Sequence, residues 1–181
     1  GSVRESQGEG DPLWPRVVAA GEVLDGPEPV HRDISIPVSD AASATAAVDT
    51  LARSGVDFIK VYTQLPRDAY FAVIAEARRV GLPVAGHVPA DVSVLEAARA
   101  GQASIEHLRD EIEPFCSPLD VDTCSQLAQS FRANRTWQVP TLAVLHSKAY
   151  FDEPAIATDL RLRYLPAGLR DERLRAERHE P

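Results

Sequence analysis

The sequence contains few residues of several types. It has no methionine, only two cysteines and, among its 19 basic residues, only two lysines, Lys60 and Lys148. No run of about 18 apolar residues occurs, so no segment is predicted to span a membrane. The formal net charge of −8 argues against nucleic acid as a partner, because phosphate binding needs a basic surface. No GxGxxG or phosphate-loop motif follows a predicted strand, which disfavours nucleotide binding.

The two cysteines, Cys116 and Cys124, fit no zinc-binding spacing. We expect them to be two incidental thiols; the alternative is a disulfide that closes this short loop. Gly1 and Ser2 are typical of a cleaved tag, and residues 1–15 are interpreted as a segment that leads into the fold. The sequence leaves the cellular compartment open.

The middle of the chain repeats one unit, in which a helix and a glycine precede a short apolar strand. Apolar spacing predicts helices over about residues 40–54, 66–80, 91–100 and 120–133, and strands over 16–24, 56–63, 82–89, 102–108 and 136–145. Such alternation indicates a parallel sheet, either open and doubly wound or closed as a barrel. The charged stretch over residues 147–181 is predicted to be a separate helical segment after a domain over 16–146.

Three polar side chains lie near the ends of successive predicted strands, namely Lys60, His87 and His107. The carboxyl ends of parallel strands form one edge of the sheet, where sites are built. Each residue alone has an ordinary structural explanation, since a strand-end histidine is usually hydrogen-bonded and a lysine can extend to solvent. Three of them at matching positions instead predict one shared site.

Histidine nitrogens suit zinc or a similar transition metal. A protonated lysine is no ligand, because the ammonium group has no lone pair. A neutral Lys60 could react with carbon dioxide, however, and the resulting carbamate resembles a carboxylate that bridges two metal ions. Two such ions can activate water and polarise a carbonyl together.

The segment from Gly55 to Leu108 resembles the imidazolonepropionase-like and prolidase-like members of the amidohydrolase superfamily. The markers are FIKVY, GHVP and SIEHL, in the expected order, and RVVAAGEVLDGP and VPTL resemble flanking parts, so that the resemblance covers about residues 3–146. It implies an α/β fold, a partial (β/α)8 barrel of the TIM type with about strands three to seven. It further implies one or two divalent metal ions, usually zinc, bound by a carboxylated Lys60 with His87 and His107. It also implies that Tyr62 lies near the substrate; the alternative is a packed aromatic side chain.

The implied reaction is hydrolysis of an amide or other C–N bond, in a dipeptide or a cyclic amide. The family also carries His-x-His on its first strand and an Asp after its last strand, and neither has a counterpart in this sequence. We therefore expect an incomplete barrel with little activity by itself, which associates as a homo-oligomer or by strand exchange at its open edges. Two alternatives remain open, a Schiff-base aldolase that uses Lys60 and a non-catalytic βα scaffold.

Overall fold

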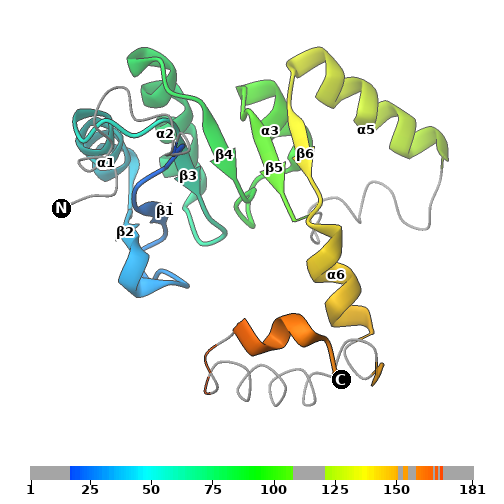
Figure 1. The fold of residues 1–181 in the computed structure, drawn as a ribbon. Coiled ribbons are helices and arrows are strands. Elements are labelled where there is room, and N and C mark those ends of the chain that lie inside the picture. Colours follow the sequence, from blue (N-terminus) through cyan, green and yellow to red (C-terminus); the bar gives the residue numbers. More distant parts are fainter. Residues whose placement is uncertain are drawn as a thin grey trace, which may run out of the picture. The chain divides into compact units, whose positions relative to one another are not determined.

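The computed structural model describes residues 17–107, 121–150, 153–154, 158–164, 166 and 168. The chain divides into two compact units, Gly1–Val139 and Pro140–Pro181, which we describe separately. The first unit contains one open sheet of six parallel strands (Figure 1). The strands are β1 (Val23–Asp25), β2 (Ser35–Pro37), β3 (Ile59–Val61), β4 (Val84–Gly86), β5 (Ser104–Glu106) and β6 (Trp137–Val139).

The strand order is β2-β1-β3-β4-β5-β6. The five predicted strands lie in chain order, as β1-β3-β4-β5-β6, and the sheet has a sixth strand, β2, which was not predicted and pairs with the outer side of β1. Only the short 3-10 helix η1 (Arg32–Ile34) lies between β1 and β2, so no helix carries the chain across to a position beside β3. From β3 to β6 each strand lies beside the preceding one, as successive helical crossovers predict.

The helices of this unit begin and end at recognisable signals. Asp40 caps α1 (Ala41–Arg53), because its carboxylate accepts the Ser43 backbone N–H at 2.7 Å. Helix α2 (Arg67–Val80) follows Pro66 and ends at Gly81, which has a φ of 76°. Helix α3 (Val94–Ala100) is shorter than predicted, since its cap is Ser93. Helix α5 (Val121–Asn134) lies close to the predicted range.

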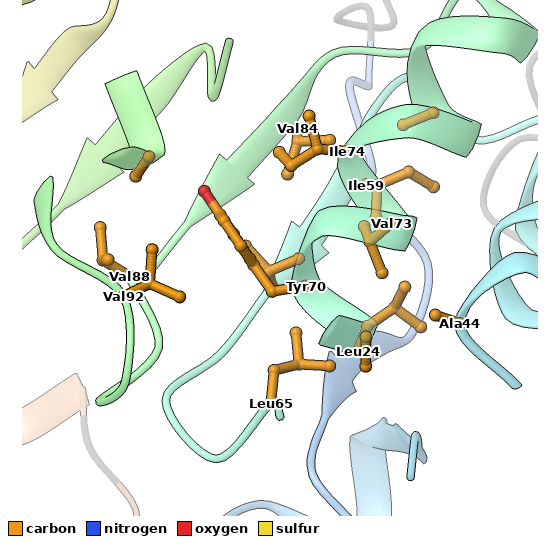
Figure 2. Close-up of a cluster of buried hydrophobic side chains, with 14 of the residues drawn as sticks. Leu24, Ala44, Ile59, Leu65, Tyr70, Val73, Ile74, Val84, Val88 and Val92 are labelled. Carbon is orange, nitrogen blue, oxygen red and sulfur yellow. The ribbon is translucent and has the colours of Figure 1, made fainter. Parts of the chain in front are cut away.

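One core joins these helices to one face of the sheet. Alternate strand residues contribute fully or nearly fully buried side chains, and helical residues of α1, α2, α3 and α5 belong to the same cluster. Figure 2 shows Tyr70 of α2 crossing this core, with its hydroxyl oxygen directed away from Leu24 and Leu65. The strand members of the cluster are Leu24, Ile59, Val61, Val84 and Ile105. The opposite face of these strands is therefore available for a site.

The prediction of one long strand over residues 136–145 is wrong in its second half. Strand β6 ends at Val139, and helix α6 (Leu142–Ala149) begins the second unit. Pro140 lies between them and has no N–H to continue a ladder. The second unit also contains the 3-10 helix η2 (Leu160–Tyr164). None of the described helices is long and apolar enough to cross a membrane.

The expectation of two incidental thiols is also wrong. Cys124 in α5 is disulfide-bonded. The other cysteine, Cys116, lies outside the described residues. Cysteine spacing alone does not distinguish a bridged pair from an unbridged one, because the bond depends on how far apart the two Cα atoms lie in the fold.

Candidate active site

Strand register places Lys60, His87 and Glu106 on the face of the sheet opposite the one that α1, α2, α3 and α5 cover, which we call the site face. In the parallel ladder Lys60 is paired with Ala85, and Ala85 with Ser104. Paired residues share a face, as do residues two apart on one strand. His87, directly after β4, and Glu106, the last residue of β5, therefore lie on the site face one step closer to the carboxyl edge.

Lys60 forms an ion pair with Glu106, two strands away. Its long side chain reaches Glu106 because the intervening positions of its row carry only Ala85 and Ser104. Both charged side chains are mostly but not completely shielded, with exposed fractions of 18% and 19%. The pair therefore compensates two charges that would be costly to bury singly.

The two histidines lie side by side at the ends of β4 and β5. Their ring centroids are 5.0 Å apart and their planes are inclined by 71°. His87 is buried, and its Nδ1 is 3.0 Å from the Thr63 hydroxyl oxygen. His107 Nε2 is 3.8 Å from the Glu106 carboxylate. Lys60, His87 and His107 are thus brought together through Glu106 and through the contact between the two rings.

His107 has an unusual backbone conformation. Its φ is 82°, in the left-handed region that non-glycine residues seldom adopt. The conformation is held in place because the His107 N–H donates to the Val139 carbonyl at 2.8 Å. Residues with such a backbone concentrate at functional sites, where the surrounding structure maintains the strain. The geometry of His107 is therefore consistent with a functional position.

Tyr62 lies over the buried histidine, on the site face of the segment that follows β3. Its ring stacks on the His87 ring at a centroid distance of 4.1 Å. Its hydroxyl is 3.1 Å from His31 Nε2. The structure thus adds His31 to the group, a residue that the sequence pattern did not indicate. His31 is in the connection between β1 and β2, where no strand or helix period draws attention to it.

Buried Asp25 holds the His31 loop in position. One carboxylate oxygen accepts the Val30 N–H at 2.9 Å, and the other accepts the Gln64 N–H at 2.8 Å. Asp25 is completely buried, so both oxygens are satisfied by backbone donors from two different loops. The loop residue next to His31 is therefore tied to the loop that follows Tyr62.

These donors are suited to a metal ion only as part of a larger set. Two neighbouring imidazole rings are ligands that zinc prefers, but zinc sites use three or four protein ligands. Within the described ranges, no group of three or more His, Cys, Asp or Glu side chains is arranged to hold a metal ion. A carboxylated Lys60 would supply the missing acidic donor, whereas the ammonium form paired with Glu106 would not.

Comparisons with known proteins identify the fold. No protein-family model matches the sequence, and neither does any curated protein. The structure is similar to the bottromycin amidohydrolase, with a TM-score of 0.63 and 27% sequence identity over 88% of this chain. It is also similar to a Bifidobacterium longum protein assigned as a prolidase, with a TM-score of 0.54 and 27% identity over 72% of this chain. A Xaa-Pro dipeptidase with bound methionine in its active site shares the fold, with a TM-score of 0.53 and 22% identity over 87% of this chain.

The chain spans only part of each of these proteins, namely 37%, 33% and 41% of their lengths. The predicted fold class, a partial α/β barrel of parallel strands, is therefore confirmed.

Proposed function

We propose that this chain, which has the fold of part of an amidohydrolase-type barrel, carries part of the metal centre of an amide hydrolase. The observation that supports this most is the meeting of Lys60, His87 and His107 at the carboxyl ends of three adjacent strands. His87 and His107 would bind the metal through imidazole nitrogens, and Lys60 would bind it as a carbamate. The metal is one or two divalent ions, for which zinc suits this donor set.

The bound metal would supply Lewis-acid chemistry, which polarises a carbonyl and lowers the pKa of bound water. The residues of the chain have roles beside it. Thr63, 3.0 Å from His87 Nδ1, fixes the ring orientation, as partners of metal-binding histidines do. Tyr62 and His31 form a polar pair above the His87 ring, and we propose that Tyr62 contacts the substrate.

The substrate class is an amide or another C–N bond, in a dipeptide or a cyclic amide. The support comes from the similar proteins, which are named an amidohydrolase, a prolidase and a Xaa-Pro dipeptidase. Because the chain spans less than half of each of these proteins, we also state the activity of the whole enzyme as part of this proposal.

We further propose that the 181-residue chain has little turnover by itself and associates through its sheet edges. In the described part of the chain, β2 and β6 are the outer strands of an open sheet. On β6, Trp137 is 75% exposed and Val139 is 42% exposed. An outer strand also leaves backbone N–H and C=O groups without a neighbouring strand, so a second copy or an exchanged strand is expected to pair with this edge.

Zinc binding tests the central claim. The parent chain, supplied with bicarbonate, should bind zinc in calorimetry, and the double variant His87→Ala, His107→Ala should lose that binding. His146→Ala is the matched control, because His146 is outside the proposed set of ligands and its loss should leave zinc binding unchanged. A carbon-13 carbamate signal from labelled bicarbonate should appear with zinc and be absent from Lys60→Arg. Retention of zinc by the double variant would show that the ligand assignment is wrong.

The two alternative functions give different results. A Schiff-base aldolase would be trapped at Lys60 by borohydride with a carbonyl substrate, whereas a metal hydrolase would not. A non-catalytic scaffold would bind zinc no better than the double histidine variant. Neither alternative is favoured by a particular contact in the described residues.

A further inference from the structure

A buried polar network lies behind the site, on the loop between α3 and β5. Its central residue is Gln102, whose side chain is completely buried, as is that of Tyr70. Burial raises the pKa of the Tyr70 hydroxyl above its ordinary range, so this group stays protonated and can donate. An uncharged polar side chain inside a core is retained at a cost in free energy unless its hydrogen bonds are made.

Three hydrogen bonds hold the Gln102 side-chain amide. Its oxygen accepts the Tyr70 hydroxyl at 2.6 Å. Its nitrogen donates to the Gly86 carbonyl at 3.0 Å and to the Ser104 carbonyl at 2.9 Å. Because both backbone carbonyls can only accept, the amide orientation is determined by chemistry. One side chain thus links the carboxyl end of β4 to β5.

The Gly86 carbonyl is the important partner, since it belongs to the peptide unit that leads into His87. The N–H of that same peptide unit, on His87, donates to the Val61 carbonyl of β3 at 3.1 Å. The peptide plane is therefore held at its N–H by β3 and at its oxygen by Gln102. Fixing this plane restricts the direction in which the His87 side chain leaves the backbone.

The Gln102 backbone extends the same connection to the neighbouring elements. Its N–H donates to the Ala97 carbonyl in the last turn of α3 at 3.1 Å. Its carbonyl accepts the Thr136 hydroxyl, next to β6, at 2.9 Å. The residue is therefore anchored independently of the strands whose carbonyls its side chain binds.

We infer that Gln102 is a positioning residue that fixes the end of β4, which bears His87, relative to β5, the strand that His107 follows. The contacts above support the positioning role, whereas its consequence for metal binding rests on the proposed function. Imidazole rings must be held within a fraction of an ångström to share an ion. Releasing the amide clamp is therefore expected to weaken metal binding without removing any ligand.

The test compares Gln102→Met with Tyr70→Phe in the 181-residue chain. Methionine has a similar length but donates no hydrogen bond to the strand carbonyls. Tyr70→Phe is the matched control, because it removes a buried hydroxyl of the same network and leaves both strand contacts in place. Two quantities are measured, the zinc affinity and, without zinc, the NMR resonances of the His87 and His107 rings, assigned with His87→Ala and His107→Ala.

Gln102→Met should lower zinc affinity by about 10- to 100-fold, the range for residues that orient metal ligands, and should shift both ring resonances. Tyr70→Phe should lower the melting temperature but leave affinity and resonances close to the parent values. If both variants change the two readouts in proportion to lost stability, or if Gln102→Met leaves the rings unshifted, the positioning role is wrong. If the parent binds no zinc while Gln102→Met still shifts both rings, the proposed function fails and the positioning role stands.

A measurement on the parent chain covers the case in which Gln102→Met does not fold. The side-chain amide protons of Gln102 should exchange with solvent far more slowly than those of the exposed Gln129. Exchange of the Gln102 protons at the rate of an exposed amide would show that the clamp does not form.

Discussion

The two faces of the sheet differ in what their side chains contribute, and β3 shows this within three residues. Ile59 and Val61 are fully buried against the helices, whereas Lys60 between them lies on the site face and pairs with Glu106. Because side chains alternate along a strand, a stabilising role and a chemical role can be one residue apart. Substitutions on the helix-facing side should therefore change the free energy of unfolding, and those on the site face should change zinc binding.

The largest effect on stability is expected for Ile59→Ala. Ile59 is fully buried, and truncating a buried isoleucine costs about 2–5 kcal/mol through lost burial and the cavity left behind. The site-face control is the double variant Lys60→Met, Glu106→Gln, which removes both charges together and should change the free energy of unfolding by less than about 1 kcal/mol. Urea denaturation measures both. Equal losses would mean that the two faces do not differ in this way.

A smaller but still large effect is expected for Gly86→Ala. Gly86 has a φ of 129°, and an added Cβ would lie 2.2 Å from the Val61 carbonyl oxygen. Strain and overpacking together should cost about 2–4 kcal/mol. Gly81→Ala is the control, because Gly81 also has a positive φ of 76° but no atom within 4 Å of an added Cβ. It should cost only about 1–2 kcal/mol, and an equal cost at the two sites would show that the close approach of β3 is unimportant.

Local signals predicted most of the helix-facing side. The apolar face of α1 is its buried face, because residues three or four positions apart lie on the same side of a helix. Its buried residues are Ala44, Ala47, Val48 and Leu51. Gly81 and Gly101 mark the ends of α2 and α3 through their left-handed backbones. These signals depend only on residues close together in the sequence, so a single sequence is sufficient to predict them.

The site face was predictable only in part. Lys60, His87 and His107 stand at strand ends, and the parallel arrangement makes their meeting a consequence of matching offsets. The ion pair of Lys60 with Glu106 depends instead on two small residues that happen to share its row. The contacts of His31 and Gln102 join segments 31 and 16 residues apart. No local pattern encodes which distant segment a loop will contact.

The position of β2 and the switch from β6 to α6 were missed for a related reason. Strand β2 follows only the short 3-10 helix η1, so the repeated unit of helix, glycine and strand that marks β3, β4 and β5 does not precede it. The apolar run after Pro140 fits a strand or a helix equally well, because short apolar runs are ambiguous without tertiary contacts.

A smaller effect on stability is expected at His107, where glycine should be more stable than alanine because the backbone is strained. In ordinary strands and helices, Gly is less stable than Ala by about 0.5–1 kcal/mol. At His107, whose φ is 82°, alanine keeps the left-handed strain and glycine removes it. The free energy of unfolding should therefore be about 1 kcal/mol higher for His107→Gly than for His107→Ala. Because both variants lack the imidazole, the comparison isolates the backbone. The usual order, with alanine more stable, would mean that the backbone at this position is not strained.

The smallest effect is expected at the exposed rim of the helix layer, where Glu96 of α3 pairs with Arg67 of α2. The Arg67 hydrogen bond, followed by the Ser93 backbone N–H, lowers the pKa of Glu96 from its ordinary value of 4.5 to about 2. A carboxylate with a lowered folded-state pKa stabilises the fold above its unfolded pKa and loses that contribution as the pH falls through the folded value. Glu96→Gln should therefore lower the melting temperature slightly at pH 7, and the difference from the parent should shrink between pH 5 and pH 2.

The effect at Glu96 should remain small because the two side chains are 49% and 38% exposed, and solvent screens such pairs. Arg67→Gln removes the same ion pair from the other side and should give a similar loss at pH 7. Since the Ser93 contacts remain in that variant, part of its pH dependence should survive. A Glu96→Gln difference that stays constant from pH 7 to pH 2 would attribute the stabilisation to the helix cap rather than to charge. The rim would then resemble the buried side of the sheet, where uncharged contacts determine stability.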